Sequence, residues 1–451
     1  MSALMTLPDS VRQCLHTLIT AGKEVYLVGG CVRDALLGIA PHDFDLCTIA
    51  TPDQVQALFA DHNLVLSGLK HGTVGVVADG EVVEITTYRK ESTYSDNRHP
   101  DRVEFTKSIH QDLWRRDFTI NAMAWNPYRP LLDPFHGQDD LRSKILQTVG
   151  YPHQRFQEDS LRILRGVRFA VRFGLTVEEK TMQAMLDCRQ LMDNLAVERI
   201  FDELCKLLPL VKAHDLLRFA PVLTAVIPEL APMIGFDQHS PHHAYDVFTH
   251  TAYVTENTEA NLPLRWAALL HDIGKVPTFT RDENGRGHFY SHAKVSAEMA
   301  NAILRRLKAP TALRQQVVTL IAHHMTRLEP EKKILRRRLS QFGWETVELL
   351  LQLQEADMRS KGVDNSRELK QFPEIRAVLE EIRAENACLT LKDLAISGRE
   401  LLELGFAPGP AMGKCLETLL DRVLDDRLPN EKNALLKAAN SILKQTQEEN
   451  P

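Results

Sequence analysis

The stretch LVGGCVRDALLGIAPHDFDL, residues 27–46, decides the fold of the first part of this chain. The preceding apolar run begins at residue 24 and ends in two glycines, which indicates a short strand closed by a turn. Residues 32–38 have helical spacing and stop at Gly38, and residues 45–50, DLCTIA, predict a second strand. The order is therefore strand, helix, strand.

The two ends of this unit carry the residue types that hold a nucleotide. Gly29 and Gly30 follow the first strand, where glycine lets backbone N–H groups approach phosphate oxygens closely. Asp43 and Asp45 enter the second strand, and because alternate strand residues point the same way we expect two carboxylates on one face. Such oxygen ligands suit Mg²⁺, which would hold a triphosphate and lower the pKa of an attacking hydroxyl. Alone, the glycines could form a simple turn and the aspartates a solvated strand edge.

Outward from this stretch, the chain changes character once. Thr51-Pro52 opens a predicted helix, and Asp79-Gly80 lies in an alternating segment that predicts a hairpin over 71–89. From about residue 154 to the end, apolar residues recur at helical spacing and strand signals vanish. The fold class is α+β, a mixed-sheet head followed by helices. The predicted parts are a head over 1–150, a helical neck over 151–215, a helical body over 216–370 and a helical tail over 371–451.

Composition limits the function classes. The 451 residues are 44% hydrophobic and 25% charged, which is globular composition. The 54 Lys and Arg against 60 Asp and Glu leave a net charge of −6, which argues against an RNA-wrapping protein but leaves room for a local basic groove. No apolar run approaches the roughly 20 residues that span a membrane, and the start has no cleavable-signal pattern, so we expect a cytoplasmic protein.

Three motifs in order carry a family resemblance. The stretch 27–46, RRDFTINAMAW (115–125) and EDSLRILRGVRFA (158–170) resemble the bacterial-type tRNA nucleotidyltransferase and poly(A) polymerase family over about the first 210 residues. The resemblance implies a nucleotidyltransferase palm with Asp43 and Asp45 as the catalytic Mg²⁺ ligands. It also implies a nucleotide site made of Gly29, Gly30, Arg33 and Arg116, with Asp159, Arg162, Arg165 and Arg168 in a nucleobase-binding neck helix.

The neck residues step by three, so neighbouring members are predicted to share one helix surface. They could form a solvated ion-pair ladder. An acceptor beside a donor is also a base-reading pair: cytosine and adenine show an amino donor next to a ring-nitrogen acceptor, and guanine and uracil reverse that order. Asp159 accepting and Arg162 donating would admit C and A, because mispaired buried polar groups cost about 1–3 kcal/mol each.

The loop ESTYSDNRHPDR (91–102) resembles the flexible loop of CCA-adding enzymes, and the chain has no basic C-terminal extension. The resemblance therefore implies addition of C, C and A to the 3′ end of tRNA with CTP and ATP. Poly(A) polymerase of the same family is the alternative. Asp96 and Arg98 are candidates for the switch from C to A, or ordinary solvent-loop residues.

The helical body contains a second constellation. His271-Asp272 after an apolar run, followed by Ile-Gly-Lys, resembles the HD phosphohydrolase superfamily. Imidazole with carboxylate suits Mn²⁺, Ni²⁺, Co²⁺ or Zn²⁺, which would activate water against a phosphoester, with Lys275 neutralising the phosphate. The resemblance assigns His250, His271, Asp272 and Asp357 to one divalent metal, and His292, His323 and His324 to a possible second metal. The alternative to metal binding is that the histidines are packed inside the helical body. For the chain as a whole, the alternatives are a phosphohydrolase whose head only positions RNA and a catalytically silent RNA-binding module.

Basic runs supply candidate tRNA-backbone contacts. RRLK (305–308) and KKILRRRL (332–339) are locally positive, and 405–430 resembles the helix-opening segment near the end of many CCA-adding enzymes. Charge runs are also common on plain solvated helix faces. The sequence does not distinguish a monomer from a homodimer.

Overall fold

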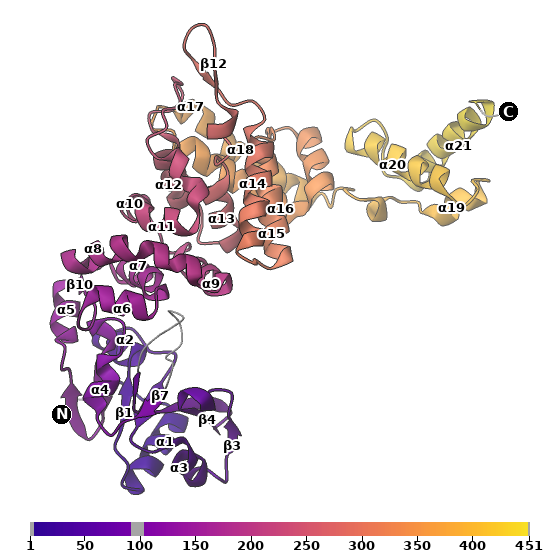
Figure 1. Cartoon of the computed structure of the whole chain (residues 1–451). Helices are drawn as coiled ribbons and strands as arrows, with labels where there is room; N and C mark the ends of the chain where they lie inside the picture. Colours follow the sequence, from indigo (N-terminus) through magenta and orange to yellow (C-terminus); the bar gives the residue numbers. More distant parts are fainter. Residues whose placement is uncertain (1–3, 92–102, 450–451) are drawn as a thin grey trace. The chain divides into compact units, whose positions relative to one another are not determined.

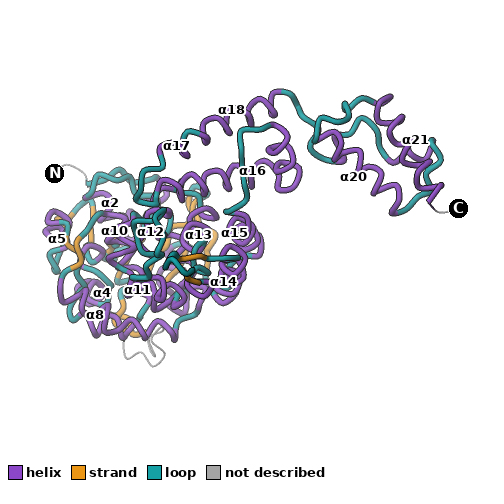
Figure 2. The backbone as a smooth tube through the Cα atoms, turned by 90° about the horizontal axis from the view of Figure 1, so that it is seen from above, coloured by secondary structure: helices purple, strands orange, loops and turns teal. Residues whose placement is uncertain are grey.

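The computed structural model describes residues 4–91 and 103–449. They belong to two compact units: a first unit of Met1–Ala231 with Arg306–Ala309, and a second unit of Pro232–Arg305 with Pro310–Pro451. Strands lie mainly in one part of the chain, and helices make up most of the rest (Figure 2). The division into head, neck, body and tail stays a prediction.

A seven-stranded mixed sheet forms the base of the first unit, in the order β3-β4-β5-β2-β1-β8-β9. Neighbouring strands are antiparallel except β2 and β5, which run parallel. The turn Asp79-Gly80 joins β4 and β5 as predicted, with φ of 49° and 79°. The strands are β1 (Val25–Val28), β2 (Asp45–Thr48), β3 (Asn63–Val65), β4 (Thr73–Ala78), β5 (Glu81–Thr87), β8 (Ala124–Asn126) and β9 (Arg129–Leu132).

Helices α1 and α3 pack against β4 (Figure 1). Thr51 caps α3 in a reciprocal capping box with Gln54, and Pro52 is its first residue, as predicted. Against α4, the sheet buries Tyr26, Cys47 and other apolar side chains. The helices of this unit are α1 (Asp9–Thr20), α2 (Gly30–Leu36), α3 (Pro52–Leu58), α4 (Ile109–Trp114), α5 (Gly137–Ser143), α6 (Pro152–Glu158), α7 (Leu161–Phe173), α8 (Glu179–Cys188), α9 (Val197–Leu207), α10 (Ala213–Arg218) and α11 (Ala220–Val226).

The second unit is helical apart from one small hairpin. Its 28-residue helix α16 contains Gly343 at φ 76° and ψ 167°, so it consists of two helices joined at a break. The helices are α12 (Val247–Asn257), α13 (Leu262–Leu270), α14 (His292–Arg306), α15 (Thr311–His323), α16 (Lys332–Arg359), α17 (Ser366–Leu369), α18 (Gln371–Ala384), α19 (Gly398–Glu403), α20 (Pro410–Leu424) and α21 (Lys432–Glu449).

The prediction that strands vanish after about residue 154 needs a small correction. Strand β11 (Thr176–Val177) pairs in parallel with β10 (Ile145–Leu146), and β12 (Thr280–Arg281) pairs with β13 (Gly287–His288). Two-residue strands are too short to leave an alternating pattern in a sequence. A further pair joins β6 (Arg89–Glu91) and β7 (Val103–Phe105). Within the described ranges, no helix is long and apolar enough to cross a bilayer.

Candidate active site and metal centre

The glycine pair and the aspartates meet in the middle of the sheet. Gly29 and Gly30 follow Val28, the last residue of β1, which lies opposite Asp45 in the β1–β2 register. Gly29 has φ 75°, and a Cβ there would lie 3.0 Å from Nη1 of Arg116. Glycine therefore keeps the backbone close to this guanidinium, where a side chain would displace it.

Asp43 and Asp45 line a cavity of about 790 Å³. Strand β2 begins at Asp45, so Asp43 lies in the preceding loop, which corrects the prediction that the two alternate along one strand. Protein crowding around the carboxylate raises the pKa of Asp45, Arg116 opposes that effect, and the charge of Asp43 raises the pKa further. A divalent cation would relieve this repulsion, so the two oxygen donors fit Mg²⁺.

Glu84 of β5 lines the same cavity, and the sequence reasoning missed it. The only available signal is the parallel pairing of β2 with β5, in which Leu46 lies opposite Ile85. That pairing is not legible from spacing along the chain. With Glu81 at the start of the same strand, Glu84 brings the carboxylates of the cavity wall to four.

A second cavity, of about 430 Å³, contains most of the predicted nucleotide site. The guanidinium groups around it form an anion site suited to phosphate groups. The predicted residues that line it are Gly29, Gly30, Arg33, Asp45, Arg116, Asp159, Arg162, Arg165 and Arg168. The lining residues that sequence reasoning missed include Arg115, Asp117, Asn121, Phe169, Arg172 and Arg199.

Asp159 does not lie on the neck helix as the spacing predicted. It has extended backbone (φ −148°, ψ 103°) between α6 and α7. Its carboxylate accepts a hydrogen bond from the backbone N–H of Leu161 at 3.1 Å and pairs with Arg199 of α9 at 2.9 Å. The correction has a local cause, because an aspartate just before a helix satisfies an N–H group that the helix leaves without a partner.

Arg162 and Arg168 are held by carboxylates of their own. Arg162 donates to Glu158 at 2.6 Å and to the main-chain carbonyl of Arg115 at 3.2 Å. Arg168 donates to Glu203 of α9 at 2.6 Å. These bonds fix the direction of both guanidinium groups at the cavity wall.

Arg165 and Asp117 form an ion pair with two hydrogen bonds in this cavity wall. Nε and Nη2 of Arg165 donate to Oδ2 of Asp117 at 2.9 and 2.7 Å, and Asn121 donates to Oδ1 at 3.0 Å. Burial alone would raise the pKa of Asp117, but Arg165 and these hydrogen bonds lower it to about 2. Asp117 is thus a permanently ionised anchor for α7.

Arg33 links α2 to α7. It is buried, and it donates to Asn121 at 2.5 Å and pairs with Asp34 at 2.6 Å. Its guanidinium also lies 4.6 Å from the ring centre of Phe173 and 5.2 Å from that of Phe169. Burial lowers the pKa of Arg33, and the charge of Asp34 opposes this effect.

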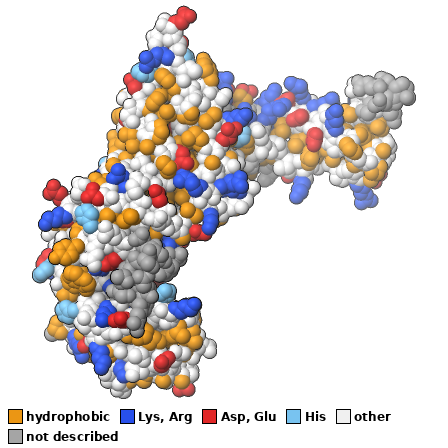
Figure 3. All heavy atoms as spheres, in the orientation of Figure 1, with side chains coloured by type: hydrophobic (Ala, Val, Ile, Leu, Met, Phe, Trp, Pro, Cys, Tyr) orange, Lys and Arg blue, Asp and Glu red, His pale blue; other side chains and the backbone are white. Residues whose placement is uncertain are grey.

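Two further predictions concern the loop after β6 and the basic runs of the chain. Asp96 and Arg98 lie outside the described residues. The basic runs are largely paired: Arg306 pairs with Glu229, and Arg337 with Asp425. On the face drawn in Figure 3, basic and acidic side chains intermingle along the C-terminal helices. Such exposed pairs are worth about 0–1 kcal/mol, so a phosphate could replace the carboxylates at little cost.

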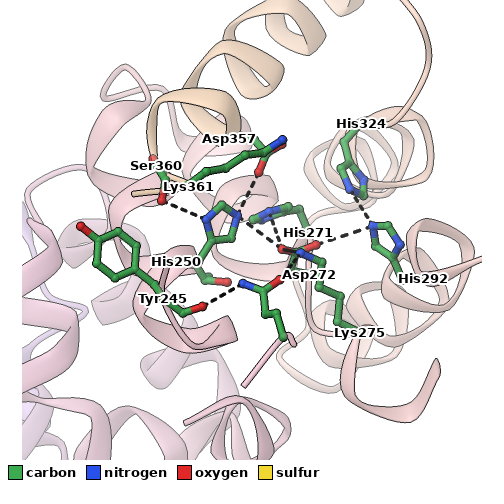
Figure 4. Close-up of polar contacts among 12 residues, drawn as sticks. Tyr245, His250, His271, Asp272, Lys275, His292, His324, Asp357, Ser360 and Lys361 are labelled. Carbon is green, nitrogen blue, oxygen red and sulfur yellow. Dashed lines mark hydrogen bonds and ion pairs between the residues drawn. The ribbon is translucent and has the colours of Figure 1, made fainter. Parts of the chain in front are cut away.

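In the second unit, the predicted metal ligands converge from separate segments (Figure 4). Nε2 of His250 lies 2.9 Å from Asp357 and 3.5 Å from Asp272, and Nε2 of His271 lies 3.1 Å from Asp272. On the other side of Asp272, Nε2 of His292 lies 3.7 Å away. Two groups of donor atoms, each within 4.8 Å of one another, therefore share Asp272. The groups are His250, His271 and Asp272, and Asp272, His292 and His324.

Each of the four imidazoles is oriented by the main chain. The Nδ1 atoms of His250, His271, His292 and His324 lie 2.7–3.1 Å from carbonyl oxygens of Ser360, Ala268, Phe289 and Ile321. A carbonyl can only accept, so each Nδ1 carries the proton and each Nε2 presents its lone pair to the cluster. In metal sites, a histidine that binds through one ring nitrogen commonly donates the N–H of the other to a carbonyl in this way.

The chemistry of the donor set fits a transition metal. Nε2 of His250, Nε2 of His271 and Oδ2 of Asp272 are buried and have ionic neighbours, but no hydrogen bond of good geometry within the described part of the chain. Burial lowers the pKa of His324 to about 4 and lowers that of His292, so both are neutral at neutral pH, the form that binds metal. Burial would raise the pKa of Asp272, but His271 and Lys275 hold it well below its usual value.

One predicted ligand does not join the cluster. His323 packs its ring on Phe342, with centroids 4.6 Å apart, and Nδ1 lies 3.4 Å from the hydroxyl of Thr326. Its assignment to a second metal was wrong, because neighbouring residues at the end of α15 point in different directions and only His324 faces inward. Sequence reasoning missed Lys361, whose Nζ lies 3.8 Å from Asp357, and His243, whose ring lies 5.0 Å from that of His250.

Models of known protein families match three segments of this chain. A family model described as "Poly A polymerase head domain" matches residues 25–147, and one described as "Probable RNA and SrmB- binding site of polymerase A" matches 174–234. A model for "tRNA nucleotidyltransferase domain 2" matches 278–439. These matches, together with the mixed sheet of the first unit, indicate the nucleotidyltransferase class of protein.

Relatives narrow the class. A CCA-adding enzyme of Levilactobacillus brevis is 34% identical over 438 residues, which are 95% of this chain and 97% of that protein. One from Oceanobacillus iheyensis is 50% identical over 193 residues, 43% of this chain and 48% of that protein. This chain belongs to the family of CCA-adding enzymes.

Solved structures confirm the α+β fold class. The Bacillus stearothermophilus CCA-adding enzyme in complex with CTP matches with a TM-score of 0.70 at 26% identity, covering 99% of this chain and 100% of that one. The Thermotoga maritima CCA-adding enzyme complexed with tRNA has a TM-score of 0.60 at 20% identity over 97% of this chain and 96% of that one, which shows the same fold.

Proposed function

We propose that this chain adds C, C and A in turn to the 3′ end of tRNA, with CTP and ATP as donors. The observation that carries the proposal is the cavity of about 430 Å³ in which the glycine pair and Arg116 lie with Asp159 and Arg162. Family membership over 95% of the chain supports it.

The reaction needs little covalent chemistry from the protein. The terminal ribose hydroxyl of the RNA attacks the α-phosphorus of the nucleotide, an O–P bond forms, pyrophosphate leaves, and the hydroxyl proton passes to solvent. Mg²⁺ held by Asp43 and Asp45 would supply positive charge to the triphosphate and acidify the attacking hydroxyl. Arg33 and Arg116 bind the phosphates, and the bare backbone at Gly29 leaves them room.

Base selection is assigned to Asp159 and Arg162. A carboxylate that accepts from the amino group and a guanidinium that donates to the ring nitrogen admit C and A and mispair with G and U. Both residues line the cavity, and the bonds to Arg199 and Glu158 hold them in fixed directions. Pre-fixed partners replace a nucleic-acid template in this scheme. Asp96 and Arg98, in the undescribed loop, stay candidates for the switch from C to A.

The decisive experiment incubates purified protein with tRNA lacking CCA and with CTP, ATP, GTP or UTP, singly and together, and sequences the products. Addition of C, C and A in order supports the proposal. A run of A residues would instead identify the poly(A) polymerase alternative, and no extension at all would leave a silent RNA-binding module.

A second candidate function rests on the histidine–aspartate cluster. We propose that it hydrolyses phosphoesters of nucleotides, 2′,3′-cyclic phosphates among them: water attacks phosphorus, one P–O ester bond breaks, and the leaving oxygen takes a proton. A divalent metal (Mn²⁺, Ni²⁺, Co²⁺ or Zn²⁺), held by His250, His271, Asp272 and Asp357, would activate the water. Lys275 and Lys361 line the adjoining cavity and bind the phosphate.

The test supplies each of these metals to metal-stripped protein and follows hydrolysis of adenosine 2′,3′-cyclic phosphate. Activity that appears with metal and disappears with a chelator supports the proposal. Metal binding without turnover would mean a structural centre instead. Hydrolysis by wild-type protein that extends tRNA with none of the four nucleotides would favour the phosphohydrolase whose head only positions RNA.

A further inference from the structure

The cavity beside the histidine–aspartate cluster has two unlike ends. It measures about 260 Å³, and Lys275 and Lys361 lie at its inner wall with the cluster. At its rim lie Tyr290 and Met325, which are 72% and 63% exposed. A bare phosphate would need only the cationic end, so the large apolar side chains at the mouth call for a ligand with an apolar, flat part.

The ring of Tyr290 is already half of a stack. It lies parallel to the imidazole of His288, with ring centroids 5.4 Å apart and planes 5° apart. His288 belongs to β13 and is anchored by Asp282, 2.9 Å from its Nε2. One face of Tyr290 is therefore covered by a fixed ring, and an exposed fraction of 72% leaves the other face open to solvent.

The position of this open face is set by the backbone. The hairpin of β12 and β13 comes directly before α14 (Figure 1). Tyr290 lies in the short connection, two residues before His292, the first residue of α14. Phe289, between His288 and Tyr290 in the sequence, lies against Phe279, with ring centroids 5.5 Å apart, and Nζ of Lys275 lies 5.4 Å from its ring centre. Tyr290 and Lys275 therefore line the same cavity, with Phe289 between the two in its wall.

We propose that Tyr290, backed by His288, is the stacking platform for the base of the phosphoester that the histidine–aspartate cluster hydrolyses. The inference rests on the proposed phosphohydrolase function and adds a base-binding subsite to it. A phosphate held by Lys275 and Lys361 and a flat ring on Tyr290 together describe one nucleotide. A free mononucleotide and the last nucleotide of an RNA share this chemistry.

The test compares two substrates with the same reacting ring, adenosine 2′,3′-cyclic phosphate and glycerol 1,2-cyclic phosphate, which has no base. Tyr290→Ala is expected to raise KM for the adenosine substrate by about 5- to 150-fold, because base–aromatic stacking is worth about 1–3 kcal/mol. Its kcat should stay unchanged. Tyr290→Phe, which keeps the ring, should restore the KM. Tyr128→Ala, at a tyrosine that is 75% exposed in the first unit, is the matched control.

Equal changes in KM for both substrates, or none for the adenosine substrate, would overturn the platform. An oligoribonucleotide ending in a 2′,3′-cyclic phosphate forms a second arm, and the arm with the lower wild-type KM identifies the source of the nucleotide. If wild-type protein hydrolyses neither, the proposed hydrolase fails, and the platform is judged by calorimetry with adenosine 3′-monophosphate. Tyr290→Ala should then remove one class of binding site, and an unchanged isotherm would overturn it.

Discussion

The two sites of this chain treat their polar groups in opposite ways. In the first unit, Asp43 and Asp45 are exposed, and arginines such as Arg165 and Arg168 are matched by carboxylates. In the second unit, the imidazoles are buried or half-buried, and the buried Nε2 atoms of His250 and His271 have no well-formed hydrogen bond in the described ranges. The first arrangement suits a large charged ligand that leaves after each turnover. The second suits a small cation that stays.

This difference predicts that the sites can be disabled separately. Asp43→Ala with Asp45→Ala should lower incorporation of labelled CTP into tRNA lacking CCA by about 10³-fold or more, because positive charge at the reacting phosphate is lost. Hydrolysis of cyclic phosphate should be unchanged. Asp53→Ala, at the exposed start of α3, is the matched control. Continued incorporation would refute the assignment of the palm.

The reverse variant tests the other side of the comparison. His271→Ala with Asp272→Ala should remove bound metal and lower phosphoester hydrolysis by about 10²- to 10³-fold, since metal assistance is worth several kcal/mol. CCA addition should persist. Because loss of a buried ionic group can unfold a protein, Asp357→Asn, which preserves side-chain volume, provides a milder variant. Metal content by mass spectrometry and both activities are measured. Loss of both activities in the folded Asp357→Asn protein would contradict two independent sites.

The paired charges of the first unit should also make the free energy of unfolding depend on pH in the acidic range. The pKa of Asp117 falls from 3.8 to about 2 on folding, so its ionised form adds about 2 kcal/mol of stability that is fully present above about pH 4. As the pH falls below about 4 this contribution to the free energy of unfolding declines: about half of it is lost by pH 3, and most of the rest is lost as the pH falls through about 2. Asp117→Asn should therefore be less stable than wild type at pH 7 and lose less between pH 5 and pH 3.

Urea unfolding at pH 7, 5 and 3 checks this, with Asp53→Asn as the control on an exposed carboxylate. Parallel pH profiles for wild type and Asp117→Asn would show that the pair with Arg165 contributes nothing to stability.

The smallest expected effect concerns selectivity. Asp159→Ala should reduce the preference for CTP and ATP over GTP and UTP by about 5- to 150-fold, equivalent to about 1–3 kcal/mol for one mispaired polar group. Separate kcat/KM values for the four nucleotides measure it. Asp187→Ala, an exposed aspartate that pairs with His153 on the same unit, is the control. If the preference does not change, Asp159 acts only as the helix-start acceptor and the partner of Arg199.

Patterns that extend over a few neighbouring residues were enough to predict secondary-structure elements, and short motifs were enough to predict candidate metal ligands. The hairpin at Asp79-Gly80 and the start of α3 follow from residue conformations that operate within a few positions. The four principal ligands of the second unit come from three separate segments, since His271 and Asp272 are neighbours, and these segments converge. The fold class was predictable for the same reason.

What failed depends on direction in space rather than on spacing. Arg165 finds its carboxylate 48 positions away and Arg168 finds its own 35 positions away, separations that no local pattern encodes. Neighbouring helical residues differ by about 100° around the axis, so the choice between His323 and His324 depends on which face of α15 is packed. The three-residue spacing predicted Asp159 on the helix with the arginines, but Asp159 lies just before α7 and accepts a hydrogen bond from a backbone N–H at the start of that helix.

The break at Gly343 has a mechanical consequence for the second unit. A continuous helix of 28 residues would be a rod of about 42 Å, with the basic run at one end and Asp357 near the other. Because the backbone is broken at residue 343, this segment is two helices, and their axes need not share one direction. The direction of the first helix, which carries Arg336 and Arg337, is therefore not imposed on the second helix, which carries Asp357 of the cluster.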